Sequence, residues 1–152
     1  MKLAEALILR ADYQKRIQQI KERLIRSSLI QEGDEPPEQP QTLLDELQSL
    51  MNQLTDLIQK INQTNSSTDL EDNLSISDAL AQRDTLLLQR NIYESLIENA
   101  AISQNRYAPS EIRYISTVNI AELQSVMDRI SRDYRLLDTK IQQANWHTEL
   151  VE

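Results

Sequence analysis

Apolar residues recur along the chain at spacings of three and four in four separate stretches, with polar residues between them. This is the period of an α-helix that buries one face. The stretches cover approximately residues 2–30, 42–62, 76–101 and 119–146. The two most regular repeats lie in the second and fourth stretches: Leu43, Leu47, Leu50, Leu54, Leu57 and Ile61, and then Ile120, Leu123, Met127, Ile130, Tyr134, Leu137, Ile141 and Ala144. The pattern predicts an all-α protein with an antiparallel, four-helix bundle-like architecture.

The first break in the pattern, residues 31–41, is acidic and rich in proline. Pro36, Pro37 and Pro40 cannot continue a helix, because proline lacks the amide hydrogen and its ring clashes with the preceding turn. Neither flanking helix could fold alone, so we interpret the break as a connector and expect the two helices to pack antiparallel. We therefore predict a single helical domain over residues 1–152.

The two later breaks have different compositions. Residues 64–77 are polar, and Asp72 and Asn73 form a pair typical of a tight turn, which favours a short hairpin. Residues 111–118 are rich in β-branched and aromatic residues, which favour extended structure. We expect a short extended or β element near residues 111–118. A lone strand needs a partner, which would be residues 68–76 or another subunit.

The second stretch carries an additional apolar line, formed by Leu44, Met51 and Ile58, beside its main repeat. Together the two lines make a stripe that is wider than contact with one neighbouring helix requires. The fourth stretch adds a repeat without interruption. The chain therefore has more apolar surface than we expect it to cover by itself, and such surface is typical of an interaction site. We predict a homo-oligomer.

The composition excludes several classes of function. The chain has no cysteine, one glycine and one histidine, and its formal net charge is −8. A thiolate or two-histidine metal centre and a Gly-rich phosphate loop therefore cannot form within one chain. The charge argues against nucleic acid as a partner, because phosphate binding requires a surplus of Lys and Arg. We expect no metal and no cofactor, and we rank an enzyme last because no acid–base pair can be named.

Charged residues interrupt the apolar stretches, including the N-terminal one, which contains Glu5 and Arg10. No window approaches the roughly 20 apolar residues that span a bilayer. The sequence predicts no membrane span and no secretion signal, and therefore a cytoplasmic location.

Polar residues gather at the predicted end of the second helix and at the predicted start of the third. They are Asn62, Thr64, Asn65, Asp78, Arg83 and Asp84. Antiparallel packing would bring the two groups together across the intervening loop. The cluster is either a small-ligand pocket or a buried polar network that holds the loop in place, and the residues alone leave both interpretations open.

A second group combines aromatic and basic side chains: Arg106, Tyr107, Arg113 and Tyr114. Such a group can stack on nucleobases, but the acidic net charge opposes that use. Because Tyr and Arg are enriched at protein contacts, we interpret these four residues as candidate interface anchors.

Several irregular segments of the chain are distinctive. They are Lys2-Leu3-Ala4-Glu5-Ala6-Leu7, Arg10-Ala11-Asp12, Gln31-Glu32-Gly33-Asp34-Glu35-Pro36, Ile61-Asn62-Gln63-Thr64-Asn65, Asp78-Ala79-Leu80-Ala81-Gln82-Arg83-Asp84, Ser110-Glu111-Ile112-Arg113, Leu137-Asp138, Ile141-Gln142 and Asn145-Trp146. In these segments the chain resembles a family of small uncharacterised bacterial proteins that are sometimes labelled septicolysin-like. The resemblance covers essentially the whole chain. It implies a helical protein that assembles with itself, a hexamer being one such assembly, and the label would imply a cytolysin.

We therefore predict a self-assembling, non-enzymatic cytoplasmic protein whose cellular role the sequence does not specify. One alternative is a small-ligand binding module that uses the polar cluster. Another is a membrane-active, cytolysin-like protein.

Overall fold

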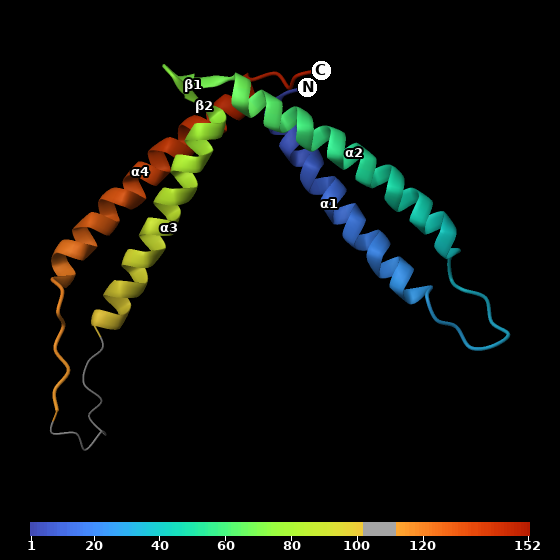
Figure 1. The fold of residues 1–152 in the computed structure, drawn as a ribbon, viewed down its shortest axis with the longest axis horizontal. Coiled ribbons are helices and arrows are strands. Elements are labelled where there is room, and N and C mark those ends of the chain that lie inside the picture. The colour runs from blue at the N-terminus through green and yellow to red at the C-terminus, as the bar shows by residue number, and fades with distance from the viewer. Residues whose placement is uncertain (102–111) are drawn as a thin grey trace. The chain divides into compact units, whose positions relative to one another are not determined.

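The computed structural model describes residues 1–101 and 112–152, which form four helices and one two-stranded hairpin (Figure 1). The elements follow one another as α1 (Leu3–Arg26), α2 (Pro40–Ser67), β1 (Asp69–Glu71), β2 (Leu74–Ser75), α3 (Ile76–Ala100) and α4 (Ile120–His147). The prediction of a mostly helical protein with four helices is confirmed. The chain folds into two compact units, which are described separately below.

Local chemistry explains where the helices begin. At the start of α1, the backbone N–H of Lys2 donates to Glu5 Oε2 at 2.7 Å, as in one half of a capping box. Helix α2 begins with Pro40 in its first turn, where the missing amide hydrogen has no cost. At the start of α4, the backbone N–H of Glu122 donates to Asn119 Oδ1 at 3.2 Å, so Asn119 acts as the N-cap of this helix.

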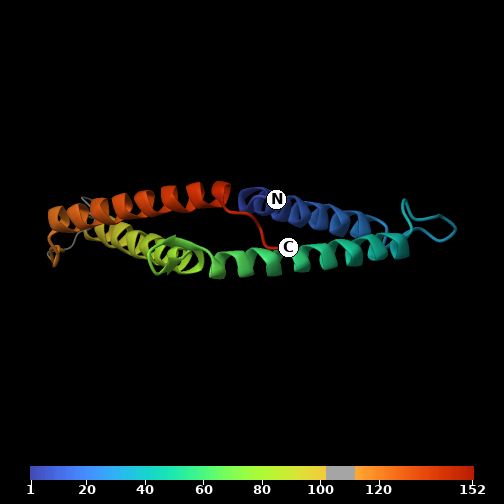
Figure 2. The same cartoon turned by 90° about the horizontal axis from the view of Figure 1, so that it is seen from above.

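Unit 1 comprises residues 1–76 and 142–152 and is built on the pair α1 and α2. The two helices run antiparallel and lie side by side, joined by the predicted proline-rich connector (Figures 1 and 2). Their interface is centred on Ile20, Leu43 and Leu50, all of which are buried. Partly buried apolar side chains pack against these three: Tyr13, Ile17, Leu24 and Leu47. Full burial of one such aliphatic side chain is worth about 1.5–3 kcal/mol, so this face is what holds α1 and α2 together.

The last residues of the chain also belong to unit 1. Residues 148–151, which we call the terminal strap, run beside the N-terminus. The backbone N–H of Leu3 donates to the carbonyl of Thr148 at 2.9 Å, and that of Leu150 donates to the carbonyl of Met1 at 2.8 Å. Glu149 accepts ion pairs from Lys2 Nζ at 2.5 Å and from the amino group of Met1 at 3.3 Å.

The hairpin forms where the polar break at residues 64–77 was expected to turn. Strand β1 pairs antiparallel with β2, and Asn73 between them has a positive φ of 59°. Asn tolerates this conformation better than most residues, which explains the turn at the predicted position. Of the short extended or β element expected near residues 111–118, residues 112–118 contain no strand, and Glu111 lies outside the described residues. Strand β1 pairs with β2, which follows it after a two-residue turn, and not with residues 112–118.

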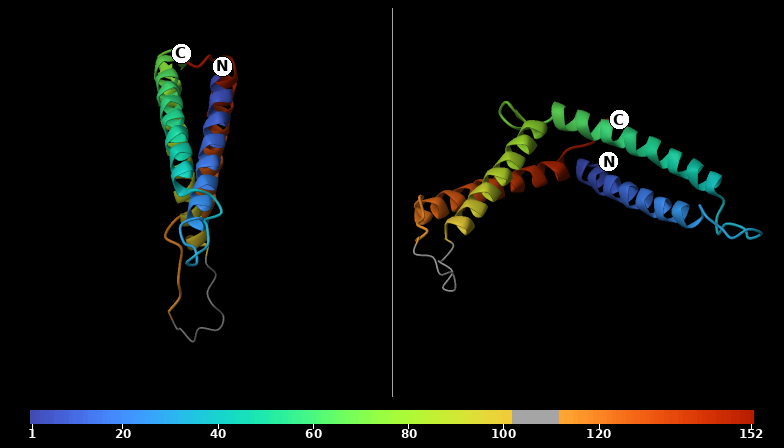
Figure 3. Two further views of the ribbon diagram at one scale, coloured as in Figure 1. Left: turned by 90° about the vertical axis from the view of Figure 1, so that its right-hand side faces the viewer. Right: turned by 60° about the horizontal axis from the view of Figure 1, so that its bottom comes forward.

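Unit 2 comprises residues 77–141, of which 102–111 lie outside the described part. Helix α3 runs beside α4 within it in Figure 1, and the two helices cross in the right-hand view of Figure 3. The side-chain contacts between the helices include those of Arg83 Nη1 with Asp138 Oδ1 at 3.0 Å and of Arg90 Nε with Ser131 Oγ at 2.9 Å. In the described part of the unit, the buried hydrophobic residues are Ala79, Ile130 and Ile141. Polar contacts therefore join the two helices beside apolar side chains, such as Leu86 and Leu137, that are only half-buried.

Candidate functional site

The predicted polar cluster is divided between the two units. Asn62, Thr64 and Asn65 lie on α2 in unit 1, whereas Asp78, Arg83 and Asp84 lie on α3 in unit 2. Each group is described by itself.

In unit 1, Thr64 binds the terminal strap. Its side chain is only 1% exposed, and its hydroxyl donates to the carbonyl of Lys60 at 2.8 Å. The same oxygen accepts a hydrogen bond from the backbone N–H of Val151 at 3.0 Å. Both functions of the hydroxyl are thus used inside the protein. Asn62 is exposed and Asn65 is half-buried. Sequence reasoning missed this role of Thr64, because no local signal connects it to a residue 87 positions later.

In unit 2, Arg83 connects α3 to α4. Its guanidinium donates to Asp138 Oδ1 and also to Asp84 Oδ1, at 3.1 Å from Nη2 and 3.2 Å from Nε. Partial burial by itself would lower the pKa of the Arg83 guanidinium, but the hydrogen bonds to Asp138 and Asp84 outweigh it and raise the pKa. Asp78 is exposed in the first turn of α3. The arrangement is that of an interhelical ion pair, and Asp138 is the partner that sequence reasoning did not identify.

The opposite face of α3 is apolar. Arg83 and Arg90 are seven residues apart and so share the face that contacts α4. Ile92 lies nine residues after Arg83, which is two and a half helical turns, so it points away from α4. Leu88 and Leu96 lie one turn to either side of Ile92. These three side chains, which we call the outer face of α3, are 61%, 58% and 40% exposed for Leu88, Ile92 and Leu96 respectively.

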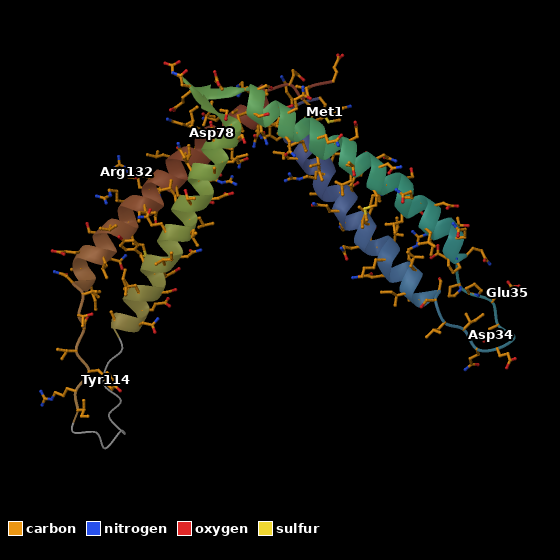
Figure 4. The ribbon with its side chains drawn as sticks, viewed as in Figure 1. Met1, Asp34, Glu35, Asp78, Tyr114 and Arg132 are labelled. Carbon is orange, nitrogen blue, oxygen red and sulfur yellow. The ribbon has the colours of Figure 1, made fainter. Side chains whose placement is uncertain are left out.

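A cleft of about 460 Å³ lies at the C-terminal end of this face. It is lined by Leu96, Asn99 and Ala100 of α3 and by residues 114–118, and its surface is mostly apolar. Residues 112–118, which we call the tip segment, lie beyond the helix ends, as the label of Tyr114 indicates (Figure 4). Ile112, Tyr114 and Ile115 in this segment are 78%, 83% and 83% exposed.

The candidate interface anchors can be placed only in part. Arg113 and Tyr114 are both exposed, as an interface role requires. Arg106 and Tyr107 lie outside the described residues. The exposed Ile112 and Ile115 were not identified as anchors, because the β-branched and aromatic composition of this segment favoured extended structure.

Two features of residues 1–101 and 112–152 are relevant to metal binding and to the membrane: the grouping of metal-ligating side chains, and the length and polarity of the helices. No group of three or more His, Asp or Glu side chains there is arranged to hold a metal ion. In the same residues, every helix is too short or too polar to cross a bilayer.

The fold and these surfaces define a mostly helical protein with an exposed apolar helix face and an exposed apolar tip. Residues 10–150 match the model of a family of unknown function, DUF6847, and the chain belongs to that family. The chain is similar to a functionally unknown conserved protein from Corynebacterium diphtheriae, whose crystal structure has a TM-score of 0.94 to it. The two are 40% identical, and the match covers 99% of each chain. Comparison with curated proteins gives no match.

These comparisons confirm the coarse part of the resemblance: the chain belongs to an uncharacterised family and has a bacterial relative. Neither description carries the septicolysin label, which stays a prediction.

Proposed function

We propose that this protein is a self-assembling helical protein whose copies associate through the outer face of α3. The observation that carries the proposal is the exposure of Leu88, Ile92 and Leu96 on one side of a helix whose other side contacts α4. Aligned aliphatic side chains on an ordered helix are typical of a surface that a partner covers. Scattered single ones would need no such explanation.

The spacing of these three residues favours a second helix as the covering element. They are four residues apart, so they form one i±4 ridge along α3. Ridges of this kind interdigitate with the corresponding ridge of another helix, and a second copy of α3 supplies an identical one. The chain has no cysteine, so association does not depend on disulfide bonds.

Covering the outer face of α3 contributes only a modest free energy to association. Covering three aliphatic side chains that are about half exposed contributes on the order of 3 kcal/mol in total. Association costs an estimated 4 kcal/mol or more in lost translational and rotational freedom. A stable oligomer therefore needs further contacts beyond these three residues.

The test is native mass spectrometry of the untagged protein, compared with the variants Ile92→Glu and Asn91→Glu. Asn91 is exposed and adjacent, but lies about 100° around the helix, so it is a matched control for the added charge. We expect the wild type and Asn91→Glu to be oligomeric, and Ile92→Glu to shift towards monomer with an unchanged circular dichroism spectrum. A monomeric wild type, or equal masses for both variants, would contradict the proposal.

The same measurement tests the alternative of a small-ligand module. That alternative receives less support, because Thr64 and Arg83 both have partners inside the protein. A reproducible additional mass on the wild type that Arg83→Ala removes, without loss of helicity, would favour the ligand module. A separate assay tests the cytolysin-like alternative, which leakage of dye from liposomes on addition of the protein would favour.

A further inference from the structure

We propose that the loop between α1 and α2 of one copy docks on the tip segment of a second copy and places Leu29 in its cleft. The loop comprises residues 28–39, and we call it the acidic loop. The inference rests on the proposed self-assembly and adds a second, different contact to it.

The acidic loop presents apolar side chains in an ordered setting. Leu29 is 88% exposed and Ile30 is 49% exposed. Immediately after them, the backbone N–H of Asp34 donates to the carbonyl of Gln31 at 3.0 Å, and Gly33 inside this turn has a φ of +91°. A positive φ at the third position of a turn is what glycine supplies at no steric cost.

The far side of the loop is also held in place. Arg23 of α1 donates to both carboxylate oxygens of Glu38, at 2.9 Å from Nε and 2.6 Å from Nη2. A bidentate pair of this kind adds geometric definition as well as energy. Leu29 and Ile30 are therefore displayed by a loop with hydrogen bonds on both of its sides, so docking would cost little ordering entropy.

The tip segment has a complementary surface. Its cleft of about 460 Å³ falls within the range of about 300–1,000 Å³ that small-molecule pockets occupy, so it has room for two adjacent aliphatic side chains. Leu96, Ala100, Ile115 and Val118 supply apolar lining. Of all the large hydrophobic residues exposed in the described part of the chain, Leu29, Ile112, Tyr114 and Ile115 are the four most exposed. Docking of the acidic loop on the tip segment would therefore cover Leu29 and the exposed apolar residues of the tip segment together.

The charges of the two surfaces are opposite. The acidic loop contains Glu32, Asp34, Glu35 and Glu38 and no basic residue. Glu38 is already paired with Arg23, which leaves three exposed carboxylates near Leu29; Asp34 and Glu35 are labelled in Figure 4. The tip segment has one charged residue, the exposed Arg113. Opposite charges beside complementary apolar groups set the orientation of an interface and exclude wrong pairings.

The contact would be heterologous, because each copy uses two different surfaces. Such contacts close into a ring or continue as a filament. The outer face of α3 shares Leu96 with the cleft, so Leu88 and Ile92 would remain free to pair with another copy. The two contacts together supply the apolar coverage that the outer face alone lacks.

Cross-linking tests the proposal directly, because the chain has no native cysteine. We would mix the single variants Leu29→Cys and Ile115→Cys, oxidise the mixture and measure mass under denaturing conditions. Disulfides require the two α-carbons to lie within about 7 Å of each other, so formation reports close approach. We expect a mixed dimer of one chain of each variant. The control mixture pairs Leu29→Cys with Arg132→Cys, whose side chain extends from α4 away from α3 (Figure 4). It should yield at least tenfold less mixed dimer.

Charge reversal provides the second test. Arg113→Glu should weaken association about five- to tenfold, and adding Asp34→Lys to the same chain should restore it, since a surface ion pair is worth up to about 1 kcal/mol and reversal adds repulsion. Arg132→Glu is the control and should have no effect. Equal weakening by Arg113→Glu and Arg132→Glu, or no restoration by Asp34→Lys, would overturn the inference.

Three outcomes separate this inference from the proposed function. An oligomeric wild type without the mixed cross-link overturns the docking of the acidic loop and leaves association through α3 standing. A third sample, a single chain that carries both Leu29→Cys and Ile115→Cys, shows whether the contact is intramolecular. A disulfide that forms only within this chain, and not between the single variants, overturns the inference as well. A monomeric wild type without the mixed cross-link contradicts both proposals.

Discussion

Unit 1 and unit 2 are each built on a pair of long helices, but they bury their apolar residues to different degrees. Of the twelve buried hydrophobic residues in the described part of the chain, nine belong to unit 1 and three to unit 2. Unit 2 is the smaller, yet it contains eight of the sixteen large hydrophobic residues that are exposed there. The difference follows from what faces the partner helix. In unit 1 the facing residues are apolar, whereas α3 places Arg83 and Arg90 among the apolar residues of its face towards α4.

The helix pair of unit 2 thus combines polar contacts with apolar side chains that are less deeply buried than those of unit 1. The ion pair of Arg83 and the contact of Arg90 with Ser131 define how α3 meets α4. They share that face with Leu86 and Ile97, which are half-buried. Leu88, Ile92 and Leu96 lie on the opposite face and are exposed.

The largest loss of stability is expected from a substitution in the core of unit 1. Leu50→Ala should lower the free energy of unfolding by about 2–4 kcal/mol, because it removes buried methyl groups and leaves a cavity between α1 and α2. Leu88→Ala, an identical change on the outer face of α3, should cost less than about 0.5 kcal/mol in a monomeric sample. Urea denaturation of both variants measures the difference. Equal losses would mean that Leu88 is covered.

The next effect concerns the polar contact in unit 2. Arg83→Met keeps most of the stem but removes the hydrogen bonds to Asp138 and Asp84, and should cost about 1–2 kcal/mol. Hydrogen exchange should show faster opening of α3 and α4 while the amides of α1 keep their protection. Uniform acceleration in both units would contradict the assignment of this ion pair to unit 2 alone.

A smaller effect is expected at Gly33, in the connector of unit 1. A Cβ at this position meets no atom within 4 Å, so any loss on Gly33→Ala comes from the backbone, whose φ of +91° disfavours alanine. We expect a loss of about 1 kcal/mol in thermal unfolding. An unchanged Tm would show that the turn relaxes, and the ordered display of Leu29 would then lose its support.

The smallest effect concerns the terminal strap. Hydrogen bonds from Lys2 and from the amino group of Met1 lower the pKa of the exposed Glu149 carboxyl. A carboxyl whose pKa is lower in the folded state stabilises the protein above its unfolded pKa of about 4.3, and this stabilisation is lost as the pH falls through the folded value. The Tm of the wild type should therefore drop towards that of Glu149→Gln below about pH 4. Parallel Tm curves over the whole acidic range would show that these ion pairs contribute nothing.

Prediction from the sequence succeeded where structure depends on near neighbours. The helices, the break at the prolines and the turn at Asn73 follow from periodicity and from the preferences of single residues. The ends of helices were less accurate: α1 ends at Arg26 and not near residue 30, and α2 continues to Ser67 and not to residue 62. Residues 112–118 have strand-like composition but no adjacent partner, and they form no strand.

The candidate site was predictable only in its separate parts. Arg83 and Asp84 were identified as a polar pair. Asp138 lies 55 positions from Arg83, and nothing in the sequence around it indicates that it contacts Arg83. Thr64 was identified as well, but its partner is the backbone of Val151, which has no side-chain signature at all. The single domain predicted from length stays a prediction beside the two compact units.

By itself, the sequence determined the number and the approximate extent of the helices, because helical period, proline and capping residues act within a few positions of one another. Only the tertiary structure decided which apolar lines are covered. On α2 the line containing Leu43 and Leu50 is buried and the parallel line of Leu44 and Met51 is exposed, and on α3 the aliphatic line faces outwards. The physical reason is that burial depends on which face of a neighbour is available, and that is set by contacts between residues far apart in the chain.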